Sequence, residues 1–282
     1  MIVTDKKYCM DKALCGKLDL MCDRTSGKKK FDNVVLIDGN EGYGKTNMAV
    51  ACAYYVAHKL KRKYNVGNVF FDLDSMIEYA LNTKKQILHW DEAALGGMAS
   101  EWWKKNQIKF MKFLMVARKK QHFFFICIPR FYKLNDYLCI DRSIALIHVY
   151  ARQNIHLGRF TYYGVNSKEE LYNNWRSSKK RKYGEFYDIH GTFIEALPKL
   201  LDEKEYERMK DKGILSLQEN NKISDEMGVK KKLIIGFIEK QKDADVKLNS
   251  KQLAKAFEVS QRTIQAYTKE IKETYEREEQ KL

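Results

Sequence analysis

A glycine-rich segment followed by lysine and threonine is the clearest chemical signal in this 282-residue chain. It matches the pattern GxxxxGK[ST] at every fixed position. Glycines let successive backbone N–H groups turn toward phosphate oxygens in conformations that a Cβ would penalise. The lysine would reach the β- and γ-phosphates of a nucleotide, and the threonine hydroxyl would ligate Mg²⁺. The predicted phosphate-binding residues are Gly39, Asn40, Glu41, Gly42, Tyr43, Gly44, Lys45 and Thr46.

The flanks of this segment have the pattern that such a loop requires. A wholly apolar run, residues 34–37, precedes the first glycine. After Thr46, apolar residues recur at positions 49, 52, 53, 56 and 60, which is helical spacing. The sequence therefore predicts a buried strand, a phosphate loop and a helix in succession. The alternative is a glycine-rich turn that binds no ligand.

A second strand ends in two acids. Residues 87–90 are mostly apolar, and Asp91 and Glu92 follow them directly. Asp91 fits the Walker B role of organising Mg²⁺ and its waters. Glu92 fits a general base that orients and deprotonates an attacking water, which indicates hydrolysis and not only nucleotide binding. The alternative is a strand that ends in solvated charges.

The elements that must position these residues follow from periodicity. Further apolar runs predict strands at residues 68–71, 123–128 and 144–150, with helical spacing at 75–81 and again around Phe110, Phe113, Leu114 and Ala117. Strands that alternate with helices predict an α/β fold with a parallel sheet. A ligand binds at the carboxyl ends of such strands, where Lys45 and Asp91 both fall.

From Ala117 the chain reads ARKKQHFFFICIPR, ending at Arg130. Together with the Asp91-Glu92 strand, this segment resembles the FtsK/HerA superfamily of ring-forming DNA-translocating ATPases, including its Zot-like and viral or plasmid packaging branches. The resemblance covers residues 34–150 and implies a P-loop NTPase core of the RecA-like ASCE class.

The same resemblance implies roles for two arginines. Arg118, which precedes the fourth strand, would act in trans on the nucleotide of a neighbouring subunit. The family's Thr-Gln sensor positions are occupied here by Ile128 and Pro129, while Arg130 remains and would carry the sensor function. Arginine near a γ-phosphate neutralises charge that develops during transfer. The alternative for both arginines is solvated charge in a basic protein, and which of them acts in trans stays open.

The C-terminal segment has the pattern of helix, short turn and helix over residues 248–267. Ser250 and Ser260 are candidate caps of the two helices. The segment resembles a helix-turn-helix, in which exposed residues of the second helix enter the major groove. The candidate DNA contacts are Gln261, Arg262, Gln265 and Lys269. A helical hairpin used only for packing or for protein contact is the alternative.

These patterns predict four parts: an N-terminal extension (1–30), a P-loop ATPase domain (31–203), a linker (204–228) and an all-α helix-turn-helix domain (229–282). Within the second part, residues 158–164 predict a hairpin strand. The basic run from Trp175 to Tyr183, which includes the four cations at 179–182, is either a phosphate-contact loop or a solvated loop.

Composition narrows the function classes. The 52 Lys and Arg against 37 Asp and Glu give a net charge of +15, which indicates either a nucleic-acid partner or a lysine-rich coding bias. No apolar stretch reaches the roughly 18 residues of a membrane span, and no signal peptide is recognisable, so we expect a cytoplasmic protein. The six cysteines are expected to be free thiols without a zinc site.

The sequence-based hypothesis is therefore a Mg²⁺-dependent ATPase that translocates or packages double-stranded DNA for a virus or plasmid, as a homo-oligomeric ring. A helicase-loader-like ATPase and a nucleotide-gated DNA-binding regulator are the alternatives. ATP is favoured as the nucleotide because no NKxD-like guanine-reading motif follows the Walker pair.

Overall fold

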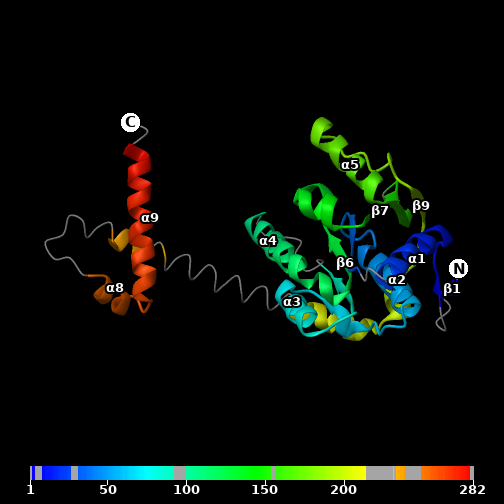
Figure 1. Ribbon diagram of the computed structural model, residues 1–282, viewed down its shortest axis with the longest axis horizontal. Helices are drawn as coiled ribbons and strands as arrows, with labels where there is room; N and C mark the ends of the chain where they lie inside the picture. The colour runs from blue at the N-terminus through cyan, green and yellow to red at the C-terminus, as the bar shows by residue number, and fades with distance from the viewer. Residues whose placement is uncertain are drawn as a thin grey trace. The chain divides into compact units, whose positions relative to one another are not determined.

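The structure, a computed structural model, describes residues 2–3, 8–26, 31–91, 100–153, 156–213, 231, 233–238 and 249–279. The chain divides into two compact units, Met1–Ile214 and Leu215–Leu282. In the first unit, helices lie against both faces of a mostly parallel sheet (Figure 1). Within the described residues, none of the helices combines the length and apolarity needed to cross a membrane.

The large sheet has seven strands. One strand lies between the strand that leads into the glycine-rich loop and the strand that ends before Asp91. Five strands are parallel, and the last two extend the sheet antiparallel to their neighbours. Across the sheet the order is β4 (Val69–Phe70), β5 (Ile87–Trp90), β6 (Phe123–Ile128), β3 (Asn33–Gly39), β7 (Ala145–Arg152), β8 (His156–Tyr163) and β9 (Ile189–Thr192). A separate two-stranded ribbon is formed by β1 (Ile2–Val3) and β2 (Tyr8–Cys9).

Alternate residues of β3 face two different cores. Val35 and Ile37 pack with helices α1 and α2, whereas Val34 and Leu36 pack with α3, α4 and α5. Because both faces are covered, β3 is buried along its whole length, and its residues 34–37 are continuously apolar instead of alternating. The helices are α1 (Lys12–Ser26), α2 (Lys45–Lys59), α3 (Leu73–Asn82), α4 (Ser100–Ala117), α5 (Val165–Ser178) and α6 (Leu197–Leu200). Single turns of 3₁₀ helix lie at Val66–Asn68, Arg118–Lys120 and Phe131–Lys133, and a π-helical turn lies at Tyr137–Arg142.

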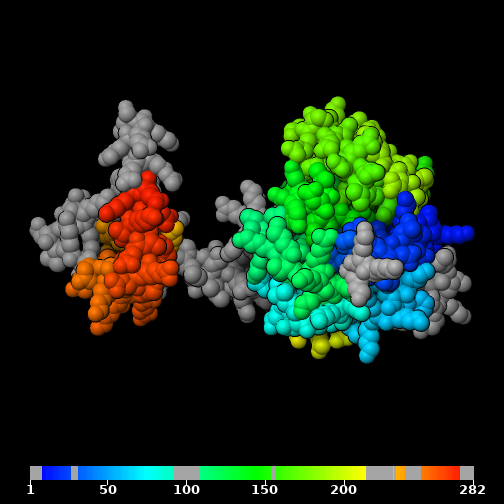
Figure 2. All heavy atoms as spheres, in the orientation of Figure 1, coloured from blue at the N-terminus to red at the C-terminus, as the bar shows by residue number. Residues whose placement is uncertain are grey.

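The predicted α/β fold with a mostly parallel sheet is confirmed. Strands β5 and β6 match their predicted ranges, and the other predicted strands differ at their ends by a few residues. The hairpin strand β8 pairs antiparallel with β7. β9 was not predicted, because its Ile-His-Gly-Thr sequence has no apolar run. The segment assigned to an N-terminal extension contributes to the core, since α1 buries Leu14, Leu18 and Met21 against it. In the space-filling view α1, in dark blue, lies against the body of the first unit (Figure 2).

The end of the first unit lies beyond the predicted domain boundary. Residues 203–213 are helical, and Tyr206 is only 2% exposed within the larger core. The position predicted for the start of the linker, residue 204, therefore falls inside the first unit. Most of the predicted linker, from residue 214 to residue 228, lies outside the described residues.

The second unit is a small helical core. Helical residues 233–238, α8 (Ser250–Ala256) and α9 (Gln261–Glu279) pack through Ile234, Leu253, Ala254 and Ile264. Ser260 caps α9, because its Oγ accepts from the Thr263 N–H at 3.1 Å. The predicted cap at Ser250 is wrong: Asn249 caps α8 and accepts from the N–H groups of Lys251 and Gln252. Asparagine one residue earlier has the carbonyl oxygen that reaches both donors.

Candidate functional site

The loop between β3 and α2 has the backbone conformation that its glycines predict. Gly39, Gly42 and Gly44 have φ values of +150°, +78° and +94°, which L side chains rarely adopt. A Cβ on Gly39 would also lie 2.3 Å from the Val149 carbonyl oxygen of the adjacent strand. Close packing of the loop against β7 thus requires glycine at this position.

Lys45 begins α2, and its ammonium folds back over the loop. Its Nζ donates to the carbonyl oxygens of Gly39 at 2.9 Å and Asn40 at 3.0 Å. The N-cap residue of α2 is Gly44, which has no side chain that could cap the helix. The first N–H groups of a helix lack intrahelical acceptors and carry partial positive charge. Loop, ammonium and helix terminus together form an arrangement suited to a phosphate group.

Thr46 and Asp91, predicted separately from two motifs, are in contact. The Thr46 Oγ1 donates to Asp91 Oδ2 at 2.7 Å, although β6 lies between the strands that carry them. Asp91 is 1% exposed. A hydroxyl and a carboxylate are hard oxygen donors of the kind that Mg²⁺ prefers, so this pair fits the predicted metal. It would supply two protein ligands and leave the other positions for water and phosphate oxygens.

Sequence reasoning missed a third group at this carboxylate. The Tyr206 hydroxyl donates to the same Asp91 Oδ2 at 2.6 Å. Burial, and secondarily the negative charge of Asp91, raises the Tyr206 pKa far above its usual 10.0, so the hydroxyl keeps its proton. Nothing in the charged sequence around Tyr206 indicates this role, because the contact is made across more than a hundred residues of chain.

Behind Asp91 lies a buried polar cluster formed by Tyr64, His89 and Cys127. His89 Nδ1 lies 3.1 Å from the Tyr64 hydroxyl, and its Nε2 lies 3.4 Å from Cys127 Sγ. Burial lowers the pKa of His89, so the imidazole is neutral. Ligand-type atoms of His89, Asp91 and Cys127 lie within 4.8 Å of one another. Both ring nitrogens of the buried His89 therefore have polar neighbours inside the protein.

The remaining predicted catalytic residues are not all gathered here. Arg130 lies two residues after the end of β6, at the carboxyl edge of the sheet, which also carries the loop. Arg118 precedes β6 at the opposite edge, where its guanidinium lies 5.1 Å from the Phe31 ring centre. The structure therefore does not bring Arg118 to the loop of its own chain. Glu92 lies outside the described residues.

In the second unit, the four candidate DNA contacts share one property. Gln261, Arg262, Gln265 and Lys269 are all exposed on α9. Positions 261, 265 and 269 are four residues apart and therefore lie on one face of the helix. The Gln261 amide donates to Ser250 Oγ at 3.0 Å, and Lys269 lies 3.7 Å from Glu273.

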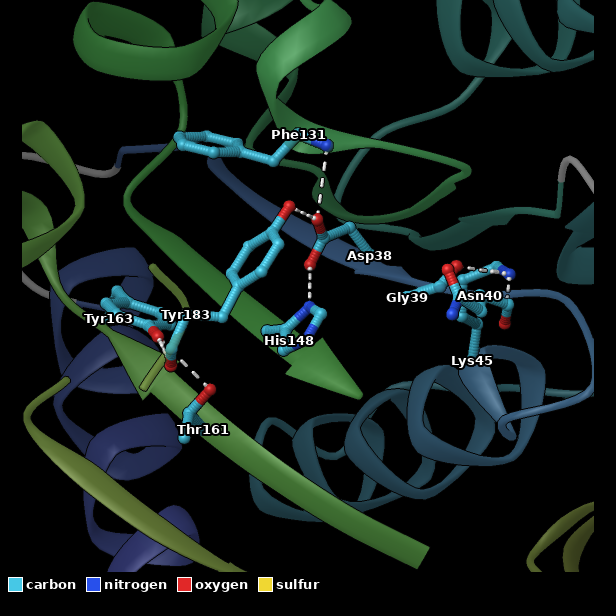
Figure 3. A network of polar contacts seen from close by, with 9 residues as sticks. All are labelled: Asp38, Gly39, Asn40, Lys45, Phe131, His148, Thr161, Tyr163 and Tyr183. Carbon is cyan, nitrogen blue, oxygen red and sulfur yellow. Dashed lines mark hydrogen bonds and ion pairs between the residues drawn. The ribbon is translucent and has the colours of Figure 1, made fainter. Parts of the chain in front are cut away.

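A second polar network begins one residue before the loop, on the other face of the sheet. The Asp38 carboxylate accepts from the Phe131 N–H at 3.1 Å and from the Tyr183 hydroxyl. Its other oxygen lies 2.9 Å from His148 Nδ1. Figure 3 shows Asp38 directed toward His148 and Tyr183, while Gly39, Asn40 and Lys45 lie to its other side. No sequence motif indicates this network, because its residues lie far apart in the chain.

Comparison with known proteins finds distant structural likenesses only. No family model matches the chain, and no curated protein matches it. Two variant structures of RuvB from Thermotoga maritima are similar at 19% and 15% identity, with TM-scores of 0.30 and 0.33. The first covers 46% of this chain and 42% of that one, and the second covers 93% and 88%.

A third solved structure is the replication initiator DnaA bound to AMPPCP and single-stranded DNA. It is 13% identical, covers 99% of this chain and 92% of that one, and has a TM-score of 0.32. Likenesses at this level carry no argument about activity. The interpretation of the site therefore rests on its own geometry.

Proposed function

We propose that the chain is a Mg²⁺-dependent P-loop ATPase of the FtsK/HerA type that moves or packages double-stranded DNA. The observation that carries the proposal is the contact between Thr46 and Asp91 beside the Lys45 loop. Two motifs from separate strands meet there as a P-loop ATPase needs them to meet.

In this proposal the loop backbone and the α2 N-terminus hold the phosphates of ATP, and Lys45 exchanges its two carbonyl acceptors for phosphate oxygens. Thr46 and Asp91 hold Mg²⁺, which would neutralise charge on the phosphates. Tyr206 keeps the Asp91 carboxylate oriented by its hydrogen bond. Glu92 orients and deprotonates the attacking water, and Arg130, at the same sheet edge, stabilises charge on the γ-phosphate.

A ring would give Arg118 its role. Arg118 lies at the sheet edge opposite its own loop, so it would serve a nucleotide only in a neighbouring subunit. Native mass spectrometry with ATP and Mg²⁺ should then show a closed homo-oligomer. Arg118→Ala should assemble but hydrolyse ATP slowly. A strict monomer at all concentrations would remove this part of the proposal.

Double-stranded DNA is the proposed substrate because the net charge is +15 and because α9 presents Gln261, Arg262, Gln265 and Lys269 on its surface. Affinity should fall steeply as salt rises, since each phosphate contact releases a counterion. Deleting residues 229–282 should reduce site preference more than ATP hydrolysis. The proposed source is a virus or plasmid, and the compartment would be the host cytoplasm.

The deciding experiment measures ATP hydrolysis with and without double-stranded DNA. We expect DNA to stimulate turnover, and we expect Glu92→Gln to abolish turnover while ATP still binds. Glu170→Gln, an exposed carboxylate on α5, is the matched control. No stimulation by DNA would contradict the motor. A Glu92→Gln variant that keeps a nucleotide-dependent DNA-binding response would instead favour the nucleotide-gated regulator or the helicase-loader-like ATPase.

A further inference from the structure

A cavity of about 580 Å³ lies over the antiparallel end of the sheet, away from the phosphate loop. Its floor is a row of paired residues on three strands, His148, Thr161 and His190. Asp38 of β3 pairs with His148 and continues this row, but it does not line the cavity. Asp38 continues the alternation of Val34 and Leu36, so the row lies on the face opposite α2. Tyr150, Arg152, Arg159, Tyr183 and Tyr187 also line the cavity.

The cavity combines positive charge with open aromatic faces. Arg152 and Arg159 line it, and none of the described residues that line it is acidic. Tyr187 is 39% exposed, and His190, which contacts it edge-on with ring centres 5.3 Å apart, is exposed as well. Guanidinium groups bind phosphate, and exposed rings stack on bases. The cavity is thus suited to a ligand with both an anionic and a flat aromatic part.

Hydrogen bonds hold the floor of the cavity in place before any ligand arrives. The His148 and Tyr183 rings are parallel, with centres 3.6 Å apart, and Asp38 bonds to both residues. Thr161 donates to the Tyr163 hydroxyl, which in turn donates to the Tyr183 carbonyl oxygen. Figure 3 shows this chain of contacts running from Asp38 to Thr161. A preorganised site loses less conformational entropy on binding.

Residues 179–182 are the most basic part of the run that is either a phosphate-contact loop or a solvated loop. They lead directly into Tyr183. The four consecutive basic residues therefore come immediately before a residue that lines the cavity. A single mononucleotide would use only the cavity. A single-stranded nucleic acid could also place the phosphates of neighbouring nucleotides along residues 179–182. The basic residues therefore favour a polynucleotide over a mononucleotide as the ligand.

We propose that this cavity is a second nucleic-acid site, which takes one nucleotide of a single-stranded DNA segment. Its base stacks on Tyr187 and Tyr150, and Arg152 and Arg159 hold the adjoining phosphates. The site is separate from the phosphate loop and does not depend on ATP hydrolysis. It adds a single-strand contact to the double-strand contact proposed for α9.

The test is photo-crosslinking of the full chain to a 15-nucleotide oligothymidylate that carries 5-iododeoxyuridine, followed by mass spectrometry. We expect adducts on peptides that contain Tyr150 or Tyr187, in the presence of excess unlabelled double-stranded DNA. Adducts confined to residues 215–282 would overturn the proposal. Lys45→Met changes the phosphate loop and leaves the cavity unaltered, so the crosslink should persist in this variant. This outcome does not depend on whether the chain hydrolyses ATP.

Binding of the same oligonucleotide, followed by fluorescence anisotropy, supplies the second readout. Tyr187→Ala and Arg152→Gln should each weaken binding by about tenfold, and Tyr187→Phe should restore it because a ring remains to stack. The matched control is Arg176→Gln, which replaces an exposed arginine on α5 whose guanidinium lies 2.7 Å from the Asp136 carboxylate. Equal effects of the Arg176 and Arg152 variants would overturn the proposal. If thymidine monophosphate competed as strongly as the oligonucleotide, the proposal that the ligand is a polynucleotide would be overturned.

Discussion

Two consecutive residues of β3, Asp38 and Gly39, belong to two differently built regions. Gly39 opens the phosphate loop, whose groups come from residues 39–46 with one long-range partner at Asp91. Asp38 anchors the opposite face through partners at positions 131, 148 and 183. The first region is local in sequence and recognisable as a motif. The second is assembled by strand pairing, so its residues are scattered and carry no motif.

The largest expected effect is on the local region. Lys45→Met should lower the rate of ATP hydrolysis by about 100- to 1000-fold, because it removes the charge that stabilises the phosphates. A coupled-enzyme ATPase assay measures this. Lys63→Met, which removes an exposed lysine beyond the end of α2, should hydrolyse at the wild-type rate. Equal turnover of the two variants would mean that the loop has no catalytic role.

A substitution in the Asp38 network should instead change the free energy of unfolding. Asp38→Asn should lower the free energy of unfolding by about 2 kcal/mol, since it removes a buried charge that three groups contact. Urea unfolding measures the change. Asp74→Asn breaks an exposed ion pair with Lys109 and should cost at most about 0.5 kcal/mol. If the two variants lost the same stability, the Asp38 network would be no more than a surface contact.

A pH experiment compares the two regions through one tyrosine of each. Burial, followed by the adjacent carboxylate, raises the pKa of Tyr183 and of Tyr206 above 10.0. Their protonated state stabilises the fold below pH 10, and that contribution is lost as pH rises, because only the unfolded chain ionises. Each should cost about 1.4 kcal/mol per pH unit above 10.

Urea unfolding between pH 9 and pH 11 tests this titration. Tyr183→Phe and Tyr206→Phe should each flatten the alkaline loss of stability by that amount. Only Tyr206→Phe should also weaken the Mg²⁺ dependence of ATP hydrolysis, by about tenfold, because it alone removes a hydrogen bond to Asp91. An unchanged alkaline slope in either variant would show that the tyrosine ionises within the folded protein.

The smallest expected effect comes from backbone strain at Gly42 in the loop. Gly42 has a φ of +78° and open space around it, so Gly42→Ala should cost about 1 kcal/mol through conformation alone. Gly16 is exposed on α1 with nothing within 4 Å, and Gly16→Ala should stabilise by about 0.5–1 kcal/mol. Thermal unfolding should therefore shift in opposite directions for the two variants. A shift in the same direction would mean that Gly42 is not held in this conformation.

The sequence by itself determined the α/β fold, most of the strands and the residues of the phosphate loop. Those features depend on neighbours in the chain: apolar runs make buried strands, and glycines followed by Lys45 make a loop at a helix N-terminus. Even the pairing of Thr46 with Asp91 was expected, because both follow strands whose carboxyl ends meet at one edge.

Only the tertiary structure decided the rest. Tyr206 reaches Asp91 from a segment predicted as linker, α1 joins the core, and Asp38 becomes the centre of a network on the opposite face. The physical reason is the same in each case. Hydrogen bonds between residues far apart in the chain depend on strand order and register, which a single sequence leaves open, and β9 completes the cavity only by pairing with β8.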